Sequence, residues 1–302
     1  MKNRLIVLPG PTGAGKTEFA IELASRLGCS IISCDSRQFY REMKIGTAAP
    51  DEQQLARVRH HFVSFLSITD YYSISLFERD VLALLPSLFA ENPVAVMTGG
   101  SMLYMDAVCR GMDDIPDTDP DVRSKYAGIY EREGIAALRM AVKMVDPEYY
   151  ARADLHNPRR LLRALEITES TGRPYSSFLT ATVRERDFSI LKAGLTRERS
   201  ELHSIIDSRV NRMMEQGLEQ EAASLIGYRH LNALRTVGYR EMFSYLDGTI
   251  TREEAVSLIK RNTRRYARRQ MTWWNRDREI TWFDASQKEL MFSWIENRLK
   301  EQ

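Results

Sequence analysis

The sequence predicts an α/β fold of the P-loop NTPase type, in which helices flank a parallel sheet, with an all-helical insertion. A glycine-rich segment at Gly10–Thr17 follows a short apolar run and precedes a helix-period segment. More short apolar runs alternate with helical patterns along the chain. Between 116 and 180 only helical patterns occur. We therefore expect a catalytic core at 1–115 and 181–302, ending in helices, and an insertion domain at 116–180.

Bulk composition fits an ordinary soluble globular protein, with 302 residues, 43% hydrophobic and 28% charged residues, and a net charge of +2. No apolar run approaches the roughly 18 residues that a membrane span needs, and the start leads into a four-residue strand instead of a signal-peptide core. We expect a cytoplasmic protein without membrane association. Cys29, Cys34 and Cys109 lack metal-ligand spacing, so we interpret them as core residues and predict no structural metal.

The glycine-rich segment fits G-x-x-x-x-G-K-[ST] completely; it consists of Gly10, Pro11, Thr12, Gly13, Ala14, Gly15, Lys16 and Thr17. Backbone N–H groups of such a loop converge on phosphate oxygens, and the next helix points its positive end there. Lys16 can reach a terminal phosphate, and the Thr17 hydroxyl can hold Mg²⁺. The following helix should stop at Gly28. The pattern indicates phosphate binding and does not specify ATP; a purely structural turn is the alternative.

Polar residues follow the next two predicted strands. Ser30–Ser33 is a short apolar strand that leads to Asp35, and ligands of open α/β sheets bind beyond the carboxyl ends of strands. Asp35 is therefore the first catalytic candidate, with a turn or helix-cap role as the alternative. The aperiodic stretch Arg37–Pro50 is interpreted as a substrate loop.

A helix is predicted over Ser75–Leu88, kinked or ended by Pro86, and the strand Pro93–Met97 follows it. That strand runs into Thr98-Gly99-Gly100-Ser101 without an aspartate. P-loop ATPases normally carry a metal-binding aspartate there, so a motor or hydrolase is disfavoured. The Ser101 hydroxyl and the free N–H groups of the turn suit a second phosphate contact.

An acidic, proline-containing stretch begins the insertion. Its aspartates are Asp113, Asp114, Asp117, Asp119 and Asp121. We interpret it as a solvated linker in preference to a carboxylate metal site. Helices are predicted over Val122–Val145, from Asp146-Pro147, and from Asn157-Pro158 to Gly172. The strand Ser189–Leu195 then returns the chain to the core.

The last long helix should begin with a capping box at Thr251 and Glu254. At about 100° per residue, five arginines share an arc of roughly 140° opposite an apolar face; they are Arg261, Arg264, Arg265, Arg268 and Arg269. Trp273, Trp274 and Trp282 follow, interleaved with more arginines. Flat aromatic rings and guanidinium groups suit a phosphate backbone with bases to stack, so this surface predicts nucleic-acid binding over a merely solvated face.

Together these segments resemble the bacterial tRNA dimethylallyltransferases, also called tRNA isopentenyltransferases. The matching pieces are GPTGAGKT, IISCDSRQFYREMKIGTAAP, GGSMLY, DPDVR, HNPRRLLRALE, RTVGYREM and RRQMTWW, in the order of the family and over nearly the whole chain. The resemblance implies that the loop holds the pyrophosphate of dimethylallyl diphosphate with Mg²⁺. It also implies alkylation of N6 of the adenosine immediately 3′ of the anticodon in tRNA.

The resemblance assigns roles residue by residue. Asp35 corresponds to the general base, Arg209 to an arginine that faces the diphosphate, and Ser101 to a position where most relatives have threonine. Residues matching tRNA-contacting segments are Asp35, Ser36, Arg37, Gln38, Ser101, Arg123, Arg159, Arg160, Arg163, Arg235, Gly238, Tyr239, Arg240, Arg268, Arg269, Gln270, Thr272 and Trp273. Two departures are Ala49, where the family usually has lysine, and the stretch 62–70, which lacks the usual acidic residue after His60-His61.

Other functions fit parts of the pattern. A P-loop kinase of a nucleoside or small alcohol would use the same loop and Asp35, without the arginine surface. A nucleotide-gated RNA-binding protein would need that surface without Asp35. A prenyltransferase of free adenine nucleotides is a further alternative. We expect a monomer whose partners are tRNA, through its anticodon stem-loop, and dimethylallyl diphosphate.

Overall fold

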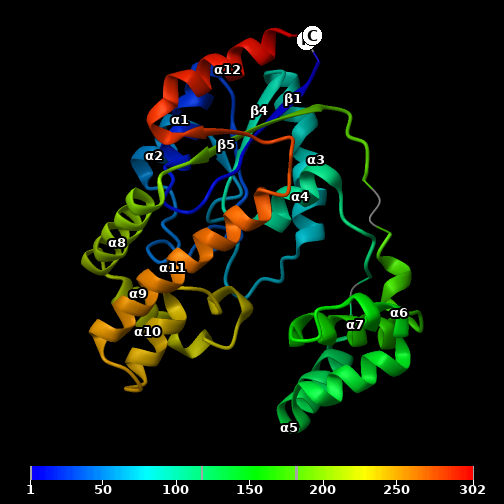
Figure 1. Ribbon diagram of the computed structural model, residues 1–302. Coiled ribbons are helices and arrows are strands. Elements are labelled where there is room, and N and C mark those ends of the chain that lie inside the picture. Colours follow the sequence, from blue (N-terminus) through cyan, green and yellow to red (C-terminus); the bar gives the residue numbers. More distant parts are fainter. Residues whose placement is uncertain (1, 117, 181–182, 302) are drawn as a thin grey trace. The chain divides into compact units, whose positions relative to one another are not determined.

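The computed structural model describes residues 2–116, 118–180 and 183–301 (Figure 1). The chain forms two compact units, one made of Met1–Arg110 with Glu185–Gln302 and the other of Gly111–Arg184. The predicted insertion limits, 116 and 180, both fall inside the second unit. Asp117 of the predicted linker lies outside the described residues.

The first unit contains a fully parallel sheet of six strands in the order β3-β2-β4-β1-β5-β6, which confirms the predicted fold class. The strands are β1 (Arg4–Leu8), β2 (Ile31–Ser33), β3 (His60–His61), β4 (Val94–Thr98), β5 (Ser189–Thr196) and β6 (Thr281–Asp284). β1 lies between β4 and β5, while the chain passes from β1 to β2 through a helix. After β1 the chain moves to β2 and β3 on one side, and after β4 it crosses to β5 on the other side of β1. The connections therefore change direction beside β1, and open sheets bind ligands at the carboxyl ends of the strands at such a point.

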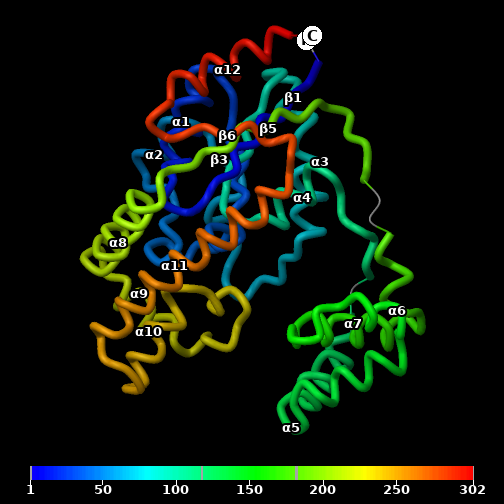
Figure 2. The backbone as a smooth tube through the Cα atoms, in the orientation of Figure 1, coloured from blue at the N-terminus to red at the C-terminus, as the bar shows by residue number. Residues whose placement is uncertain are grey.

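Helices cover both faces of this sheet. The helices of this unit are α1 (Lys16–Leu27), α2 (Glu52–Arg57), α3 (Ile74–Glu91), α4 (Met102–Arg110), α8 (Arg199–Glu215), α9 (Leu218–Leu225), α10 (Tyr239–Leu246), α11 (Arg252–Trp274) and α12 (Lys288–Lys300). In Figures 1 and 2, α1 and α12 lie together on one side of the sheet and α3 with α4 on the other. Phe19 of α1 stacks on Phe292 of α12 with ring centroids 4.5 Å apart.

Alternation along β1 explains the two cores. Leu5 and Val7 belong to the cluster that includes α3 and α4, whereas Ile6 and Leu8 belong to the cluster of α1 and α12. Successive strand residues point to opposite faces, so an unbroken apolar run is what a sheet covered on both faces requires. The three cysteines are buried and free, as predicted.

Most predicted helix boundaries are confirmed. Gly28 ends α1 in the left-handed conformation, and Thr251 with Glu254 forms the capping box of α11. Pro86 does not end α3, which was one of the two effects predicted for it, because the helix continues through it to Glu91. The apolar residues of α3 are buried on both sides of Pro86, and this packing outweighs the backbone hydrogen bond that proline removes.

The second unit is helical. It contains α5 (Pro120–Val145), interrupted at Gly134, then α6 (Pro147–Arg152), α7 (Pro158–Thr171) and a short 3-10 turn, η1 (Tyr175–Phe178). Asp146 caps α6 and Asn157 caps α7, as predicted. Asp146 is 1% exposed and also accepts hydrogen bonds from the N–H and hydroxyl of Ser176. This buried carboxylate therefore joins two segments of the unit.

Within the described ranges, none of the helices combines the length and the apolar character that crossing a bilayer requires.

Candidate active site

The glycine-rich segment Gly10–Thr17, called the phosphate loop below, follows the carboxyl end of β1 and is tightly curved. Gly13 and Gly15 have φ of 89° and 93°, which only glycine adopts readily. Gly10 lies against β5, since a Cβ atom there would come within 2.3 Å of the carbonyl oxygen of Leu195. The glycines thus allow both the tight curvature and the close approach of the loop to the sheet.

Lys16, Asp35 and Arg209 bring three charges to this loop. Lys16 donates a hydrogen bond from Nζ to the carbonyl oxygen of Pro11 at 2.8 Å. Burial lowers the pKa of Lys16 to about 7; Asp35 opposes this shift and Arg209 adds to it. Burial also lowers the pKa of Arg209. Two basic side chains and one carboxylate within interaction distance make a site that suits an anionic ligand beside a proton acceptor.

The turn after β4 closes tightly against the end of β2. A Cβ atom at Gly99 would lie 2.0 Å from the carbonyl oxygen of Cys34, and one at Gly100 would lie 3.1 Å from Oδ2 of Asp35. The N–H of Ser101 donates to the carbonyl oxygen of Cys34 at 3.1 Å. The two glycines therefore let this turn pass directly beside the Asp35 carboxylate.

Ser101 contacts the segment that follows Asp35. Its hydroxyl accepts a hydrogen bond from the N–H of Ser36 at 2.8 Å and donates to the Ser36 hydroxyl at 2.9 Å. Ser101 is 9% exposed. The hydroxyl predicted as a phosphate or tRNA contact is thus placed where it orients Ser36, and through it the neighbouring Asp35.

Gln270 has an internal position that its match to a tRNA-contacting segment does not suggest. It is 0% exposed. Its Oε1 accepts from the N–H of Thr12 at 2.9 Å, and its Nε2 donates to the carbonyl oxygen of Gly100 at 2.8 Å. The hydroxyl of Tyr266, one helical turn earlier, donates to the same carbonyl at 2.8 Å. Helix α11 is thereby tied to the phosphate loop and to the turn after β4.

The predicted substrate loop is ordered around Arg37 and Gln38. The Arg37 guanidinium donates to the carbonyl oxygens of Asn232 and Ala233 at 2.8 and 2.9 Å. Gln38 donates from Nε2 to the carbonyl oxygens of Thr47 and Ala48 at 3.3 and 3.1 Å. Arg37 therefore connects the segment after Asp35 to residues 232–233, and Gln38 connects it to a later part of the same loop.

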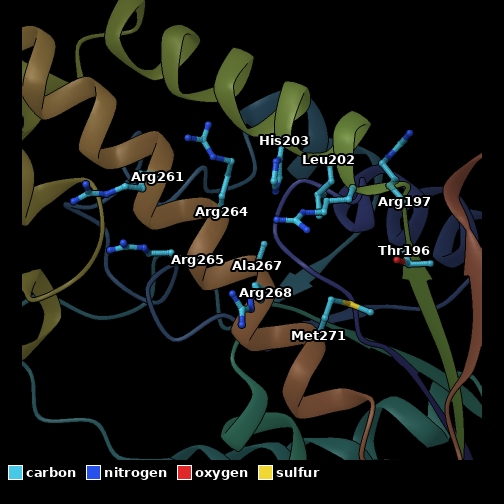
Figure 3. A pocket seen from close by; sticks show the side chains of 11 residues that line it. Thr196, Arg197, Leu202, His203, Arg261, Arg264, Arg265, Ala267, Arg268 and Met271 are labelled. Atoms are coloured by element: carbon cyan, nitrogen blue, oxygen red, sulfur yellow. The ribbon is translucent and has the colours of Figure 1, made fainter.

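We call the five predicted arginines of α11, from Arg261 to Arg269, the arginine stripe. All of them except Arg269 line a groove of about 490 Å³ between α8 and α11 (Figure 3). Leu202, Ala267 and Met271 provide its apolar lining. Arg264 forms an ion pair with Asp207 of α8. Among the described residues, Arg261, Arg265 and Arg268 have no ion-pair partner. The apolar face predicted opposite the stripe is confirmed by the burial of Ala255 and Ile259.

Of the three tryptophans after the stripe, Trp274 is buried, and Trp273 and Trp282 are half-buried. Trp274 is 2% exposed, and the indole N–H of Trp273 donates to Asp106 at 2.8 Å. The Trp282 ring covers Gly194, where a Cβ atom would lie 2.5 Å from it. The prediction that these rings offer free faces to bases is wrong for Trp274, because the end of α11 contacts α4 and the Trp274 ring joins the buried core.

The other predicted tRNA contacts divide by exposure. Arg235 and Arg240 of the first unit are exposed, whereas Gly238 and Tyr239 between them are buried. In the second unit Arg123, Arg159 and Arg160 are exposed, and Arg163 is half-buried. Arg123 and Arg163 both donate to the Thr118 hydroxyl, at 2.7 and 3.3 Å. Thr272, at the end of α11, is exposed.

Comparison with known proteins decides the family. The profile of the IPP transferase family matches residues 38–277. The chain belongs to the IPP transferase family. A tRNA dimethylallyltransferase 1 of Phocaeicola vulgatus is 50% identical over 295 residues, covering 98% of each chain. A tRNA dimethylallyltransferase 2 of Porphyromonas gingivalis is 54% identical over 279 residues, covering 92% of this chain and 93% of the relative.

A solved structure agrees with this assignment. The full-length tRNA isopentenylpyrophosphate transferase of Bacillus halodurans superposes with a TM-score of 0.72 at 33% identity, covering 100% of this chain and 98% of that one. The predicted resemblance is thus confirmed, and this IPP transferase carries its phosphate loop and Asp35 on the fold of that enzyme.

Proposed function

We propose that this IPP transferase transfers a dimethylallyl group from dimethylallyl diphosphate to N6 of the adenosine immediately 3′ of the anticodon in tRNA. The observation that carries the proposal is the placement of Asp35 beside the turn at Gly100, within the field of Lys16 and Arg209 at the phosphate loop. A proton acceptor and the basic side chains that would bind the diphosphate thus lie together at the carboxyl ends of β1, β2 and β4.

The chemistry requires both kinds of group. The bond between the allylic carbon and the diphosphate oxygen breaks, a bond from N6 to that carbon forms, and one N6 proton leaves. Charge develops on the departing diphosphate, so donors already in place lower the barrier. Lys16, Arg209 and the N–H groups of the loop supply these donors. The carboxylate of Asp35 takes the proton as general base.

The donors at this site suit a divalent cation that takes few of its ligands from the protein. The Thr17 hydroxyl, at the start of α1, is the protein ligand we propose for Mg²⁺. No cluster of three or more histidine, cysteine or carboxylate side chains that could hold a metal occurs in the described part of the chain. Mg²⁺ commonly retains water and binds substrate phosphates, and with the diphosphate it would neutralise charge on the leaving group.

The proposed tRNA substrate must change its conformation at the target adenosine. An adenosine in a structured loop must leave its stack before its amine can approach a site at strand ends, as enzymes that act on bases require. We propose that the segment from Asp35 to Gln38 forms the wall of the site that receives this base, and that exposed arginines of α11 contact the RNA backbone.

A transfer assay tests the proposal. Unmodified tRNA is incubated with labelled dimethylallyl diphosphate and Mg²⁺, and the modified nucleoside is identified by mass spectrometry. We expect N6-dimethylallyladenosine at the position 3′ of the anticodon. Parallel reactions supply ATP with small alcohols or nucleosides, and dimethylallyl diphosphate with free adenine nucleotides. Phosphoryl transfer would favour the kinase alternative. Prenylation of the free nucleotide alone would favour a prenyltransferase of free adenine nucleotides.

A further inference from the structure

A single carboxylate, Glu221 of α9, occupies the centre of the substrate loop. Its Oε2 accepts from the N–H groups of Lys44 and Ile45 at 3.0 and 2.8 Å. Its Oε1 accepts from the N–H of Gly46 at 2.8 Å and from the hydroxyl of Tyr239 at 2.7 Å. Successive N–H groups that point the same way form a concave anion site, and here a side chain of the protein fills it.

The ring of Tyr239 packs against the same loop. It is 0% exposed, and a Cβ atom at Gly46 would lie 2.6 Å from its ring. Burial, followed by the Glu221 carboxylate, raises the pKa of Tyr239, so the phenol stays protonated and donates. Because the ring is buried and cannot move aside, only glycine allows the loop to rest on it.

The loop in turn holds Gln38. The carbonyl oxygens of Thr47 and Ala48, directly after the three anchored N–H groups, accept both hydrogen bonds from the Gln38 amide. Ala48 has a φ of 49°, a conformation that non-glycine residues adopt only when their surroundings impose it. The position of Gln38 therefore depends on the bonds that Glu221 makes.

We propose that Glu221 is a positioning residue for the nucleic-acid substrate: it fixes the loop at 44–48 and thereby orients Gln38 in the wall of the base site. This inference rests on the proposed function. The phosphate loop has no bond to Glu221 among the contacts of the described residues. The effect of Glu221 should therefore concern tRNA and spare the diphosphate.

The helix offers a matched control. Glu219 lies two residues earlier on α9 and also accepts from a tyrosine hydroxyl, that of Tyr245, at 3.1 Å. Its second partner is Arg252, at 3.0 Å, and within the described part of the chain it makes no hydrogen bond to the substrate loop. Glu219→Gln therefore removes the same charge from the same helix without touching the loop.

The test measures KM for unmodified tRNA and for dimethylallyl diphosphate in Glu221→Gln, Tyr239→Phe and Glu219→Gln. Charge-assisted hydrogen bonds are lost in the first variant, so we expect its KM for tRNA to rise about tenfold or more. Tyr239→Phe removes one donor only and should raise that KM by about threefold to tenfold. The KM for diphosphate should stay within about twofold of the wild-type value in all three variants.

Hydrogen exchange gives a second readout that does not depend on activity. The amides of Lys44, Ile45 and Gly46 should exchange faster in Glu221→Gln than in Glu219→Gln. The inference is overturned if the KM for tRNA in Glu221→Gln and Tyr239→Phe equals that of Glu219→Gln, or if both substrates' KM values rise together. If Glu221→Gln does not fold, Tyr239→Phe decides. A wild-type chain without transfer activity contradicts the proposed function instead.

Discussion

The side chain of Gln270 accepts a hydrogen bond from the backbone N–H of Thr12 at 2.9 Å and so joins α11 to the phosphate loop. Thr12 and Gln270 are 258 residues apart in the sequence. The bond uses the N–H of Thr12, and the N–H of Ala14 donates to the carbonyl oxygen of Pro11 at 3.2 Å, so phosphate would be bound by other N–H groups of the loop. It also sets the distance between the loop and the turn at Gly100, because the same amide bonds to both.

Replacing Gln270 should therefore disturb diphosphate binding more than tRNA binding. Gln270→Leu keeps the volume but leaves the Thr12 N–H and the Gly100 carbonyl without this partner, a loss of about 1–3 kcal/mol. We expect the KM for dimethylallyl diphosphate to rise about tenfold while tRNA affinity stays within about twofold. Asn262→Leu is the control, since this amide lies on the same helix and donates to Glu241 of α10. Equal diphosphate KM values in the two variants would refute the role.

Diphosphate binding should take up protons through Lys16. The pKa of Lys16 is lowered to about 7, so above that pH the side chain is mostly neutral in the free protein. A bound diphosphate favours the ammonium form and raises this pKa, which requires a proton from solvent. At about pH 8, calorimetry of pyrophosphate binding in buffers of different ionisation enthalpy should show about 0.5–1 proton more uptake for wild type than for Lys16→Met.

The sign of this effect fixes its pH window. Below about pH 6 Lys16 is already charged in the free protein, so the difference between the two proteins should vanish there. Subtracting the Lys16→Met value removes the titration of pyrophosphate itself. Equal uptake by both proteins at about pH 8 would show that another group binds the proton.

Salt dependence tests the arginine stripe. A contact between Arg268 and a phosphate releases condensed counterions, so tRNA affinity should fall steeply with salt. Arg268→Gln should make the slope of log affinity against log salt shallower by roughly one unit, without lowering the melting temperature. Arg252→Gln, at the start of the same helix and paired with Glu219, should keep the wild-type slope. An unchanged slope for Arg268→Gln together with lower stability would make the stripe structural.

Local patterns predicted those parts of the molecule that depend on neighbours in sequence. The phosphate loop needs glycines with positive φ at fixed spacing, and the capping box at Thr251 needs only three residues. Asp35 was predicted from its position after a strand and from the match to the family motif. From the sequence, Gln270 was predicted only as a tRNA contact, and Glu221 was not identified. Both bond to backbone groups that lie 258 and about 175 residues away, and such partners leave no mark in side-chain identity. Trp274 was misplaced because its environment depends on how α11 docks.

Transfer by Asp35→Asn measures the central claim most directly. The amide keeps the shape of the carboxylate but cannot accept a proton from N6. With both substrates saturating and a single turnover followed, we expect the transfer rate to fall by about 10² or more while tRNA affinity changes little. A near-normal rate in Asp35→Asn would contradict the assignment of Asp35 as the general base.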